Sequence, residues 1–431
     1  MLVSNVQLVT QAASAAGNFE NTALVVGALL VLGALLAGLA HRSFLSLTAV
    51  FVIAGFALGN GGVGVLDFSP RSVFVDELAV VALIVILFRD GLEVEAEMLQ
   101  KAWHVPLRAL VLAMPLTAII IAAATKLLTD LSWTESFLLG ALLSPTDPVL
   151  SSSVVTNPRV PRLIRHSLNL ESGMNDGLAL PAVIAFSAAL ESGQSDFVWW
   201  QFVLQDVTLG LAFGVGAGLL ASVVLPRGHG LREGLTSHQK AMFALGVAAA
   251  TYGVTAIEPH GNAFIAVFTC AITLGIRRPD VRAAFEQRAE DIIEVVKLVI
   301  FVVFGSLLTI DGLFADGWAA VGIVAVTLLL ARPVALFAAL VRTGLDPETK
   351  AFMAWFGPKG VATMTFSLLV LSRGIVAGER IFNLAALVVF TSIIVHGLTD
   401  TPGANWIGRR TEARRGEPPS GEAEAAPVAA S

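Results

Sequence analysis

Apolar runs of about 17–25 residues follow one another along nearly the whole chain, separated by short polar stretches. As a helix, a run of that length spans the ~30 Å hydrocarbon core of a bilayer. Composition agrees, because 55% of the 431 residues are hydrophobic and 14% are charged, against about 25% charged in ordinary soluble domains. The sequence therefore predicts an all-α polytopic membrane protein, since helices satisfy their own backbone hydrogen bonds in lipid.

We predict thirteen transmembrane segments, some of them short or interrupted. In chain order they cover residues 21–40, 44–60, 72–89, 106–125, 133–154, 168–190, 198–225, 238–256, 260–276, 292–310, 316–341, 350–372 and 381–399. The transmembrane domain is thus expected to comprise residues 21–400, with residues 1–20 as an extracytoplasmic N-terminal segment. Residues 401–431 turn to Gly, Pro, Glu, Ala and Arg without apolar periodicity, which predicts a disordered cytoplasmic tail.

Basic residues in the connecting loops predict the orientation. The connections after odd-numbered segments hold most of them, whereas the alternate connections hold Arg71, Lys126, Arg373 and Arg380. Positively charged loops stay in the cytoplasm, so we expect the N-terminus outside and the C-terminus in the cytoplasm. A miscounted segment would scramble this alternation, which supports the count of thirteen. The pattern is typical of a multi-pass protein of the plasma membrane.

Proline and glycine interrupt two of the segments. Segment 5 contains Ser144-Pro145-Thr146-Asp147-Pro148, and segment 12 contains Gly357-Pro358-Lys359-Gly360. Such breaks free backbone groups that need a cavity, water or an ion. Because the two lie seven segments apart, they cross the membrane in opposite directions, which predicts two inverted six-helix repeats with crossed discontinuous helices. Interrupted helices at matching positions of two halves indicate a transport site near the midplane.

Three carboxylates lie at apparent membrane depth, Asp147 in the first break and Glu171 and Asp176 on the next segment. Charges at this depth are costly and usually mark an ion or proton pathway. Desolvation favours the protonated acid and a bound cation favours the ionised one, so one carboxylate can hold a proton or a cation in competition. The expected oxygen ligands of a monovalent cation are the Asp176 carboxylate, the Ser172 hydroxyl one helical turn away, and freed carbonyls around Thr146.

The other two carboxylates are expected to neutralise positive charge. Asp147 lies where half-helices end, and a carboxylate there would neutralise the positive ends of their dipoles. Glu171 needs a buried cation as its partner, for which Lys359 is the first choice and Arg332 the second. Removing one partner of such a buried pair costs several kcal/mol, because it strands a charge.

At these residues the chain resembles the NhaP-type sodium/proton antiporters of the monovalent cation:proton antiporter-1 family, which also contains the animal sodium/hydrogen exchangers. The resemblance covers about residues 21–400 and rests on Thr146-Asp147-Pro148, Glu171-Ser172 through Asn175-Asp176, Gly357-Pro358-Lys359-Gly360 and His396-Gly397. It implies that Asp176 is the cation ligand and proton carrier, with Ser172 and the region of Thr146 completing the coordination. It also implies one proton exchanged per cation, because Asn175 stands where electrogenic relatives carry a second Asp.

Two positions depart from the family pattern. The basic residue of the segment 12 motif is usually Arg, whereas Lys359 is a point charge that pairs without a bidentate fork. The acidic residue near the end of segment 3 is displaced, and Asp90 either takes its place as a ligand or entrance residue or is an ordinary helix-end acid. The resemblance further implies a homodimer and an elevator-like or rocking motion.

We therefore expect a secondary transporter, not an enzyme, that exchanges Na⁺ for H⁺ electroneutrally by alternating access, with K⁺ or Li⁺ as the alternative cation. A passive cation channel would need a continuous pore with a repeated filter. An intramembrane hydrolase would use Ser172 with His166 or His396, but His166 lies in a basic loop and His396 near the end of its segment. No cofactor and no nucleic-acid partner are expected.

Overall fold

The computed structural model describes residues 47–94, 104–147, 157–191, 197–226, 235–257 and 261–415, together with Leu24, Gly27, Val31 and Val154. Within these ranges every regular element is a helix, which confirms the predicted all-α class. Each predicted segment except the first coincides with a helix or with a set of consecutive helices. The segment at 21–40 and the N-terminal residues 1–20 lie outside the described ranges apart from Leu24, Gly27 and Val31, so the count of thirteen remains a prediction.

The helices in the first half of the described chain are α2 (Leu47–Leu58), α3 (Val73–Glu93), α5 (His104–Arg108), α6 (Met114–Leu128), α7 (Trp133–Leu143), α9 (Arg162–Glu191), α10 (Trp199–Phe202) and α11 (Thr208–Val224). Those in the second half are α12 (Ser237–Ile257), α13 (Ala263–Arg277), α14 (Pro279–Ser306), α15 (Ile310–Leu313), α16 (Trp318–Ala325), α17 (Arg332–Ala339), α18 (Pro347–Trp355), α19 (Val361–Ser372) and α20 (Gly378–Arg415). Short π-helical turns join α5 to α6, α10 to α11, and α16 to α17, at Ala109–Ala113, Val203–Val207 and Val326–Ala331. Six of the described helical stretches are long and apolar enough to cross a membrane.

Local sequence signals explain where several helices begin. Ser132 accepts a hydrogen bond from the Glu135 N–H, and the Glu135 carboxylate accepts one from the Ser132 N–H, which is a complete capping box before α7. Asn262 caps α13 through two backbone N–H groups, and Asp346 caps α18 immediately before Pro347. These caps satisfy the N–H groups that a helix start leaves without partners.

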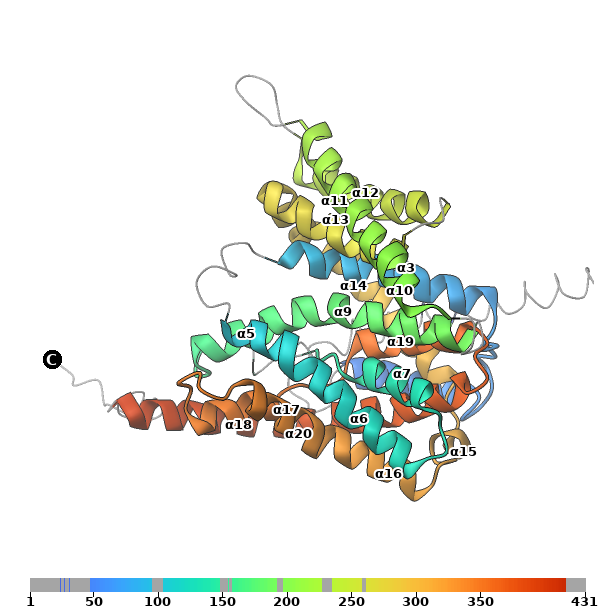
Figure 1. Cartoon of the computed structure of the whole chain (residues 1–431), viewed down its shortest axis with the longest axis vertical. Helices are drawn as coiled ribbons and strands as arrows, with labels where there is room; N and C mark the ends of the chain where they lie inside the picture. The colour runs from blue at the N-terminus through green and yellow to red at the C-terminus, as the bar shows by residue number, and fades with distance from the viewer. Residues whose placement is uncertain are drawn as a thin grey trace, which may run out of the picture.

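The helices pack into two groups, with α11, α12 and α13 toward one end of the longest axis and α16, α18 and α20 toward the other (Figure 1). The first group joins α2, α3 and α14 to α11, α12 and α13, and the second joins α5–α9 to α16–α20. The groups meet where α3 faces α9 and α19, and where α14 faces α19.

Small residues let helices of the first group approach one another closely. Gly210, Gly214 and Gly218 recur every four residues on α11, and a Cβ on any of them would collide with the backbone of α13 or of its N-cap. Close contact of this kind is how membrane helices associate, because lipid gives them no hydrophobic drive to do so.

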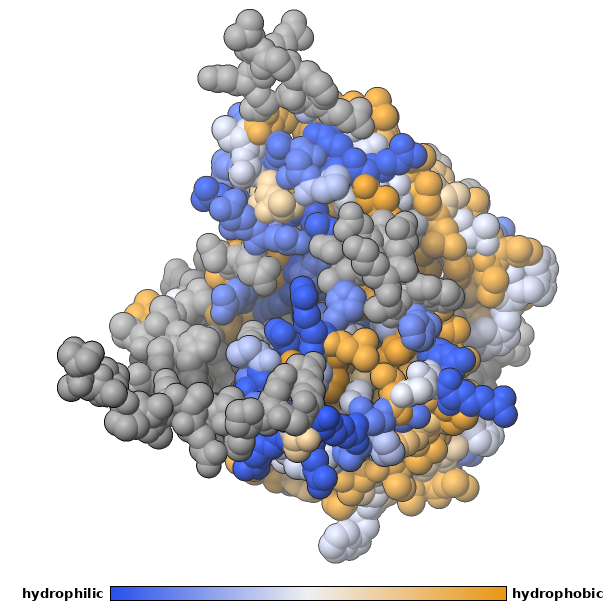
Figure 2. All heavy atoms as spheres, turned by 90° about the vertical axis from the view of Figure 1, so that its left-hand side faces the viewer, coloured by the Kyte–Doolittle hydropathy of each residue, from blue (hydrophilic) through white to orange (hydrophobic). Residues whose placement is uncertain are grey.

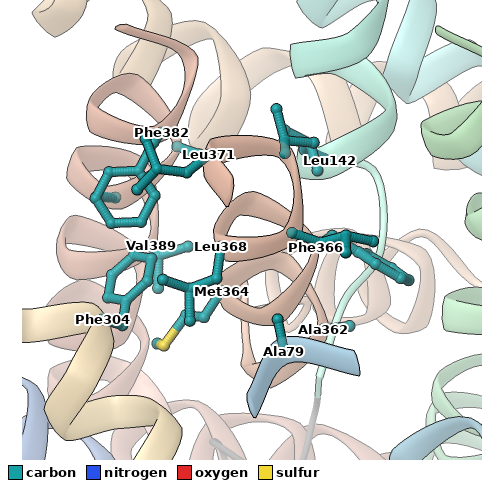
Figure 3. Close-up of a cluster of buried hydrophobic side chains, with 14 of the residues drawn as sticks. Ala79, Leu142, Phe304, Ala362, Met364, Phe366, Leu368, Leu371, Phe382 and Val389 are labelled. Atoms are coloured by element: carbon teal, nitrogen blue, oxygen red, sulfur yellow. The ribbon is translucent and has the colours of Figure 1, made fainter. Parts of the chain in front are cut away.

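The second half-helix of segment 12, α19, lies in the middle of the molecule. All of its residues from Val361 to Leu371 are buried. Figure 3 shows Met364, Phe366 and Leu368 of α19 among side chains from α3, α7, α14 and α20, and Phe304 and Phe382 belong to the same cluster. A helix that is apolar on every side and buried along its length fixes the position of the break that precedes it.

The prediction of disorder from residue 401 onward is wrong for residues 401–415, which continue α20 as a helix. Ala404 and Ile407 are buried, Gly403 lies against the Phe356 ring, and Arg414 pairs with Asp346 at 3.0 Å. Packing on neighbouring elements thus outweighs the low helix propensity of Pro402 and Gly403. Hydrophilic residues gather across the face on which α20 ends (Figure 2). Residues 416–431 lie outside the described ranges.

Candidate functional site

The two interrupted segments cross each other at their breaks. Helix α7 ends at Leu143, whereas α18 ends at Trp355 and α19 begins at Val361. The Asp147 N–H donates to the Pro358 carbonyl at 2.8 Å, so each break supplies a backbone partner that the other lacks. These contacts confirm the predicted crossed discontinuous helices. The part of segment 5 after Asp147 lies outside the described residues apart from Val154.

Lys359 joins the second break to the first through hydrogen bonds of its side chain. Its side chain is 1% exposed, and its Nζ donates to the carbonyls of Ser144 and Pro145 at 3.4 and 3.2 Å. One turn into α19, the Thr363 hydroxyl donates to the Leu142 carbonyl at 2.9 Å. The carbonyls at the end of α7, which have lost their helical donors, are therefore satisfied by segment 12.

The two glycines of the second break are required by close approach. A Cβ on Gly357 would overlap the Arg332 guanidinium, and a Cβ on Gly360 would overlap the Asp147 side chain. Asp147 itself lies before the first turn of α19, where its Oδ2 accepts a long hydrogen bond of 3.5 Å from the Val361 N–H. This is the position expected of a carboxylate that neutralises a helix N-terminus.

Glu171 pairs with Arg332, the second choice from the sequence, and the first choice of Lys359 is wrong. Arg332 Nη1 lies 2.6 Å from Glu171 Oε1, and Nη2 lies 3.2 Å from Oε2. Arg332 also donates to the Met353 carbonyl at 3.2 Å. The planar guanidinium matches both carboxylate oxygens, which a lysine ammonium does not. Lys359 instead uses its donors on the carbonyls of the first break.

Asn175 joins α9 to the first break through hydrogen bonds to Thr146. Its Nδ2 donates to the Thr146 carbonyl at 2.7 Å and contacts the Thr146 hydroxyl at 3.1 Å. The Thr146 hydroxyl also donates to Glu171 Oε1 at 3.4 Å. Thr146 therefore joins the network of Glu171 and Asn175, and the Asn175 Oδ1 remains a buried acceptor without a hydrogen-bond partner among the described residues.

Asp176 is buried at 9% exposure on the face of α9 directed toward α3. Within the described part of the chain it has no ion pair, although it lies close enough to Asp90 and Asp147 to interact with both carboxyls. Asp90 on α3 is 1% exposed and pairs through Oδ1 with Arg89, while its Oδ2 has no hydrogen-bond partner in the described ranges. Asp90 is therefore a buried acid beside Asp176, not a solvated acid at a helix end.

The structure thus brings together most of the residues predicted from the sequence. Ser172 is half-buried on α9, one turn before Asp176, as the spacing predicts. Arg89 lies beside Asp90 and close to Asp147. Ser392 of α20, which accepts a hydrogen bond from the Lys359 N–H at 2.9 Å, has no sequence signal that would single it out.

The geometry contradicts a serine hydrolase built on His396. Its Nδ1 faces the Ser392 hydroxyl and carbonyl, and its Nε2 lies 2.9 Å from the Trp355 carbonyl. Both ring nitrogens are thus engaged away from Ser172, and His396 cannot serve as its base.

Two broken helices that meet beside a buried carboxylate, itself without an ion pair among the described residues, are typical of a secondary ion transporter. The chain belongs to the sodium/hydrogen exchanger family, because the family model described as "Sodium/hydrogen exchanger, transmembrane" matches residues 28–406. The protein is accordingly a multi-pass cation/proton antiporter and not an enzyme.

Individual relatives support this assignment. The chain is 26% identical to the K(+)/H(+) antiporter NhaP of Alkalimonas amylolytica over 392 aligned residues. The alignment covers 90% of this chain and 67% of that protein. It is 25% identical to the K(+)/H(+) antiporter NhaP2 of Shewanella baltica (strain OS223), with 90% and 67% covered. The fold resembles that of the sodium proton antiporter MjNhaP1 from Methanocaldococcus jannaschii at pH 8, with a TM-score of 0.76, 17% identity, and 91% of this chain and 99% of that chain covered.

Proposed function

We propose that the protein exchanges Na⁺ for H⁺ one for one, and that Asp176 binds the cation or the proton in competition. One observation carries the proposal: Asp176 makes no ion pair with a basic residue in the described ranges, whereas Glu171 is neutralised by Arg332 and Asp90 by Arg89. A carboxylate at 9% exposure that makes no ion pair among the described residues is the group whose charge a cation or a proton must neutralise.

The charges around Asp176 support electroneutral exchange. The ion pair of Glu171 and Arg332 is neutral as a unit, and Asn175, the neighbour of Asp176, carries no charge. One acid then loses one proton as one monovalent cation binds, and no net charge moves in a full cycle.

Several oxygens near Asp176 are suited to complete the coordination of an alkali cation. The Ser172 hydroxyl lies one turn away, and the Asn175 Oδ1 and Asp90 Oδ2 are buried acceptors that have no hydrogen-bond partner in the described part of the chain. Hard cations take such oxygen ligands in preference to nitrogen or sulfur. Thr146 contributes by positioning, because its carbonyl already accepts from Asn175. Asp147 lies close enough to act on Asp176 through its charge.

The position of Asp176 supports alternating access. It lies on α9 of the second helix group and faces Asp90 and Arg89 on α3 of the first. Relative motion of the two groups, in an elevator-like or rocking manner, would expose Asp176 to either side of the membrane in turn. We further propose a homodimer in the plasma membrane, with the N-terminus outside and the C-terminus in the cytoplasm. The loop charge bias supports this orientation.

Potassium is the second candidate cation, because the NhaP and NhaP2 relatives are K(+)/H(+) antiporters. The site geometry offers the same oxygens to both ions. Selectivity would follow from the size of the cavity around Asp176 and from the number of ligands.

The test is cation-driven proton flux in proteoliposomes that contain a pH-sensitive dye. Addition of Na⁺ dissipates an imposed pH gradient in the wild type, and Asp176→Asn abolishes the effect. Asp206→Asn, a half-buried acid on another membrane helix, is the matched control and keeps full flux. Flux by Asp176→Asn equal to the wild type would refute the assignment of this carboxylate. A rate that rises when a K⁺ clamp abolishes the membrane potential would refute electroneutrality.

A further inference from the structure

A polar stripe on α20 contacts both sides of the break in segment 12. Ser392, His396 and Thr399 are spaced at i, i+4 and i+7 and therefore lie on one face of the helix. Ser392 Oγ accepts from the Lys359 N–H at 2.9 Å, just before α19. His396 Nε2 lies 2.9 Å from the Trp355 carbonyl, at the end of α18.

The aromatic ring of Trp355 adds a second contact to this stripe. It lies 5.4 Å from the His396 ring, centroid to centroid, and its Nε1 donates to the Thr399 hydroxyl at 2.9 Å. The last residue of α18 is thus held through its carbonyl, its ring face and its indole N–H. Thr399 in turn donates to the Val395 carbonyl of its own helix.

These contacts give hydrogen-bond partners to backbone groups that the break would otherwise leave without one. Helix ends carry N–H and C=O groups without intrahelical partners, and a buried group without a partner is strongly unfavourable. The Lys359 N–H lies inside the break and is buried together with its side chain. The Ser392 hydroxyl therefore takes the place of the backbone carbonyl that would accept from the Lys359 N–H in an uninterrupted helix.

Ser392 and His396 together hold Lys359 and Trp355, and we call this set of contacts the clamp. The clamp does not depend on the charge of His396. Nε2 faces a carbonyl, so it carries the proton both in the neutral Nε2–H tautomer and in the imidazolium. In the neutral form the Ser392 hydroxyl donates to Nδ1 and accepts from the Lys359 N–H at the same time. In the charged form Nδ1–H donates to the Ser392 carbonyl at 2.8 Å. Both forms hold Trp355 and Lys359.

We propose that Ser392 and His396 are positioning residues for exchange, which hold the break in segment 12 in register with the break in segment 5. Lys359 connects the two, because its N–H is held by Ser392 and its ammonium binds the carbonyls of Ser144 and Pro145. The neighbouring Thr146 accepts from Asn175, the residue before Asp176. Loosening the clamp therefore displaces the ligands around Asp176. The inference rests on the proposed role of Asp176 as the cation site.

The experiment measures the apparent Na⁺ affinity and the maximal rate of exchange in proteoliposomes for four variants. Ser392→Ala and His396→Leu weaken the apparent affinity by about tenfold, as expected when buried groups lose their partners. His396→Gln, whose amide donates to Trp355 and accepts from Ser392, stays within about twofold of the wild type. The double variant Ser392→Ala/His396→Leu has an apparent Na⁺ affinity no lower than that of the single variant with the lower affinity, because the two residues act as one unit.

Thr391→Ala is the matched control, since the Thr391 hydroxyl donates to the Leu387 carbonyl of its own helix. It keeps the wild-type affinity. An unchanged affinity in Ser392→Ala, which removes one hydroxyl and keeps the packing, would overturn the inference even if His396→Leu fails to fold. A His396→Gln variant as weak as His396→Leu would also overturn it. Wild-type vesicles without Na⁺-driven proton flux would instead refute the proposed function.

Discussion

The ion pair between Glu171 and Arg332 is predicted to stabilise the fold only while both partners are present. Both side chains are almost fully buried, at 5% and 8% exposure, and two hydrogen bonds join them. Arg332→Met strands the Glu171 carboxylate, and we expect a loss of about 3–5 kcal/mol in the free energy of unfolding. Arg332→Met/Glu171→Met removes both charges and should lose much less, because apolar pairs of similar volume often replace buried ion pairs at little cost.

The assay is equilibrium unfolding in mixed detergent micelles, with all variants compared at one pH. The matched control is the pair of Arg373 and Glu191, which are joined at 3.2 Å but are 36% and 34% exposed. Arg373→Met is expected to cost at most about 1 kcal/mol, since water screens an exposed pair. A loss for Arg332→Met no larger than that for Arg373→Met would refute the reasoning, as would a double variant less stable than Arg332→Met.

Two further predictions concern the crossing and the polar end of the first helix group. Gly360→Ala places a Cβ in the Asp147 side chain and should reduce exchange at least about tenfold, whereas Gly246→Ala, with open space around it, should leave exchange unchanged. The Arg278 guanidinium, hydrogen-bonded to Asp280 outside the membrane, lowers the pKa of that carboxyl below its usual value of 3.8. A lowered pKa stabilises the fold above about pH 4, and this contribution disappears as the pH falls further. Asp280→Asn should therefore unfold more easily than the wild type at pH 7, by a margin that shrinks below about pH 4, and a margin independent of pH would contradict this assignment.

The fold could be predicted largely from the sequence, because run length and helix-breaking residues act locally. Apolar runs of membrane length indicate the helices, and Pro and Gly within two of them mark the breaks that the structure shows crossing. The helix over residues 401–415 could not be predicted, because its Gly, Pro, Glu, Ala and Arg show no apolar periodicity. In the structure Gly403 packs on Phe356 and Ala404 is fully buried, and this tertiary contact determines the outcome.

The partners within the site were harder to predict because they depend on three-dimensional packing. The sequence gives the depth of Lys359 and Arg332 in the membrane but not the direction in which each side chain points. The bidentate geometry of Arg332 toward Glu171 emerges only when α17 packs near α9. Ser392 gave no signal, because a serine inside a helix usually bonds to its own helix backbone. Its contact with Lys359 spans 33 residues of chain.

The most direct test of competition at Asp176 is the number of protons released when Na⁺ binds to the purified protein, measured at several pH values. The account predicts one proton per cation, with an apparent Na⁺ dissociation constant that rises about tenfold for each unit by which the pH falls in the range where Asp176 is protonated. It also predicts that Asp176→Asn neither binds Na⁺ nor releases a proton. Sodium binding without proton release, with an affinity that does not change with pH, would contradict the account.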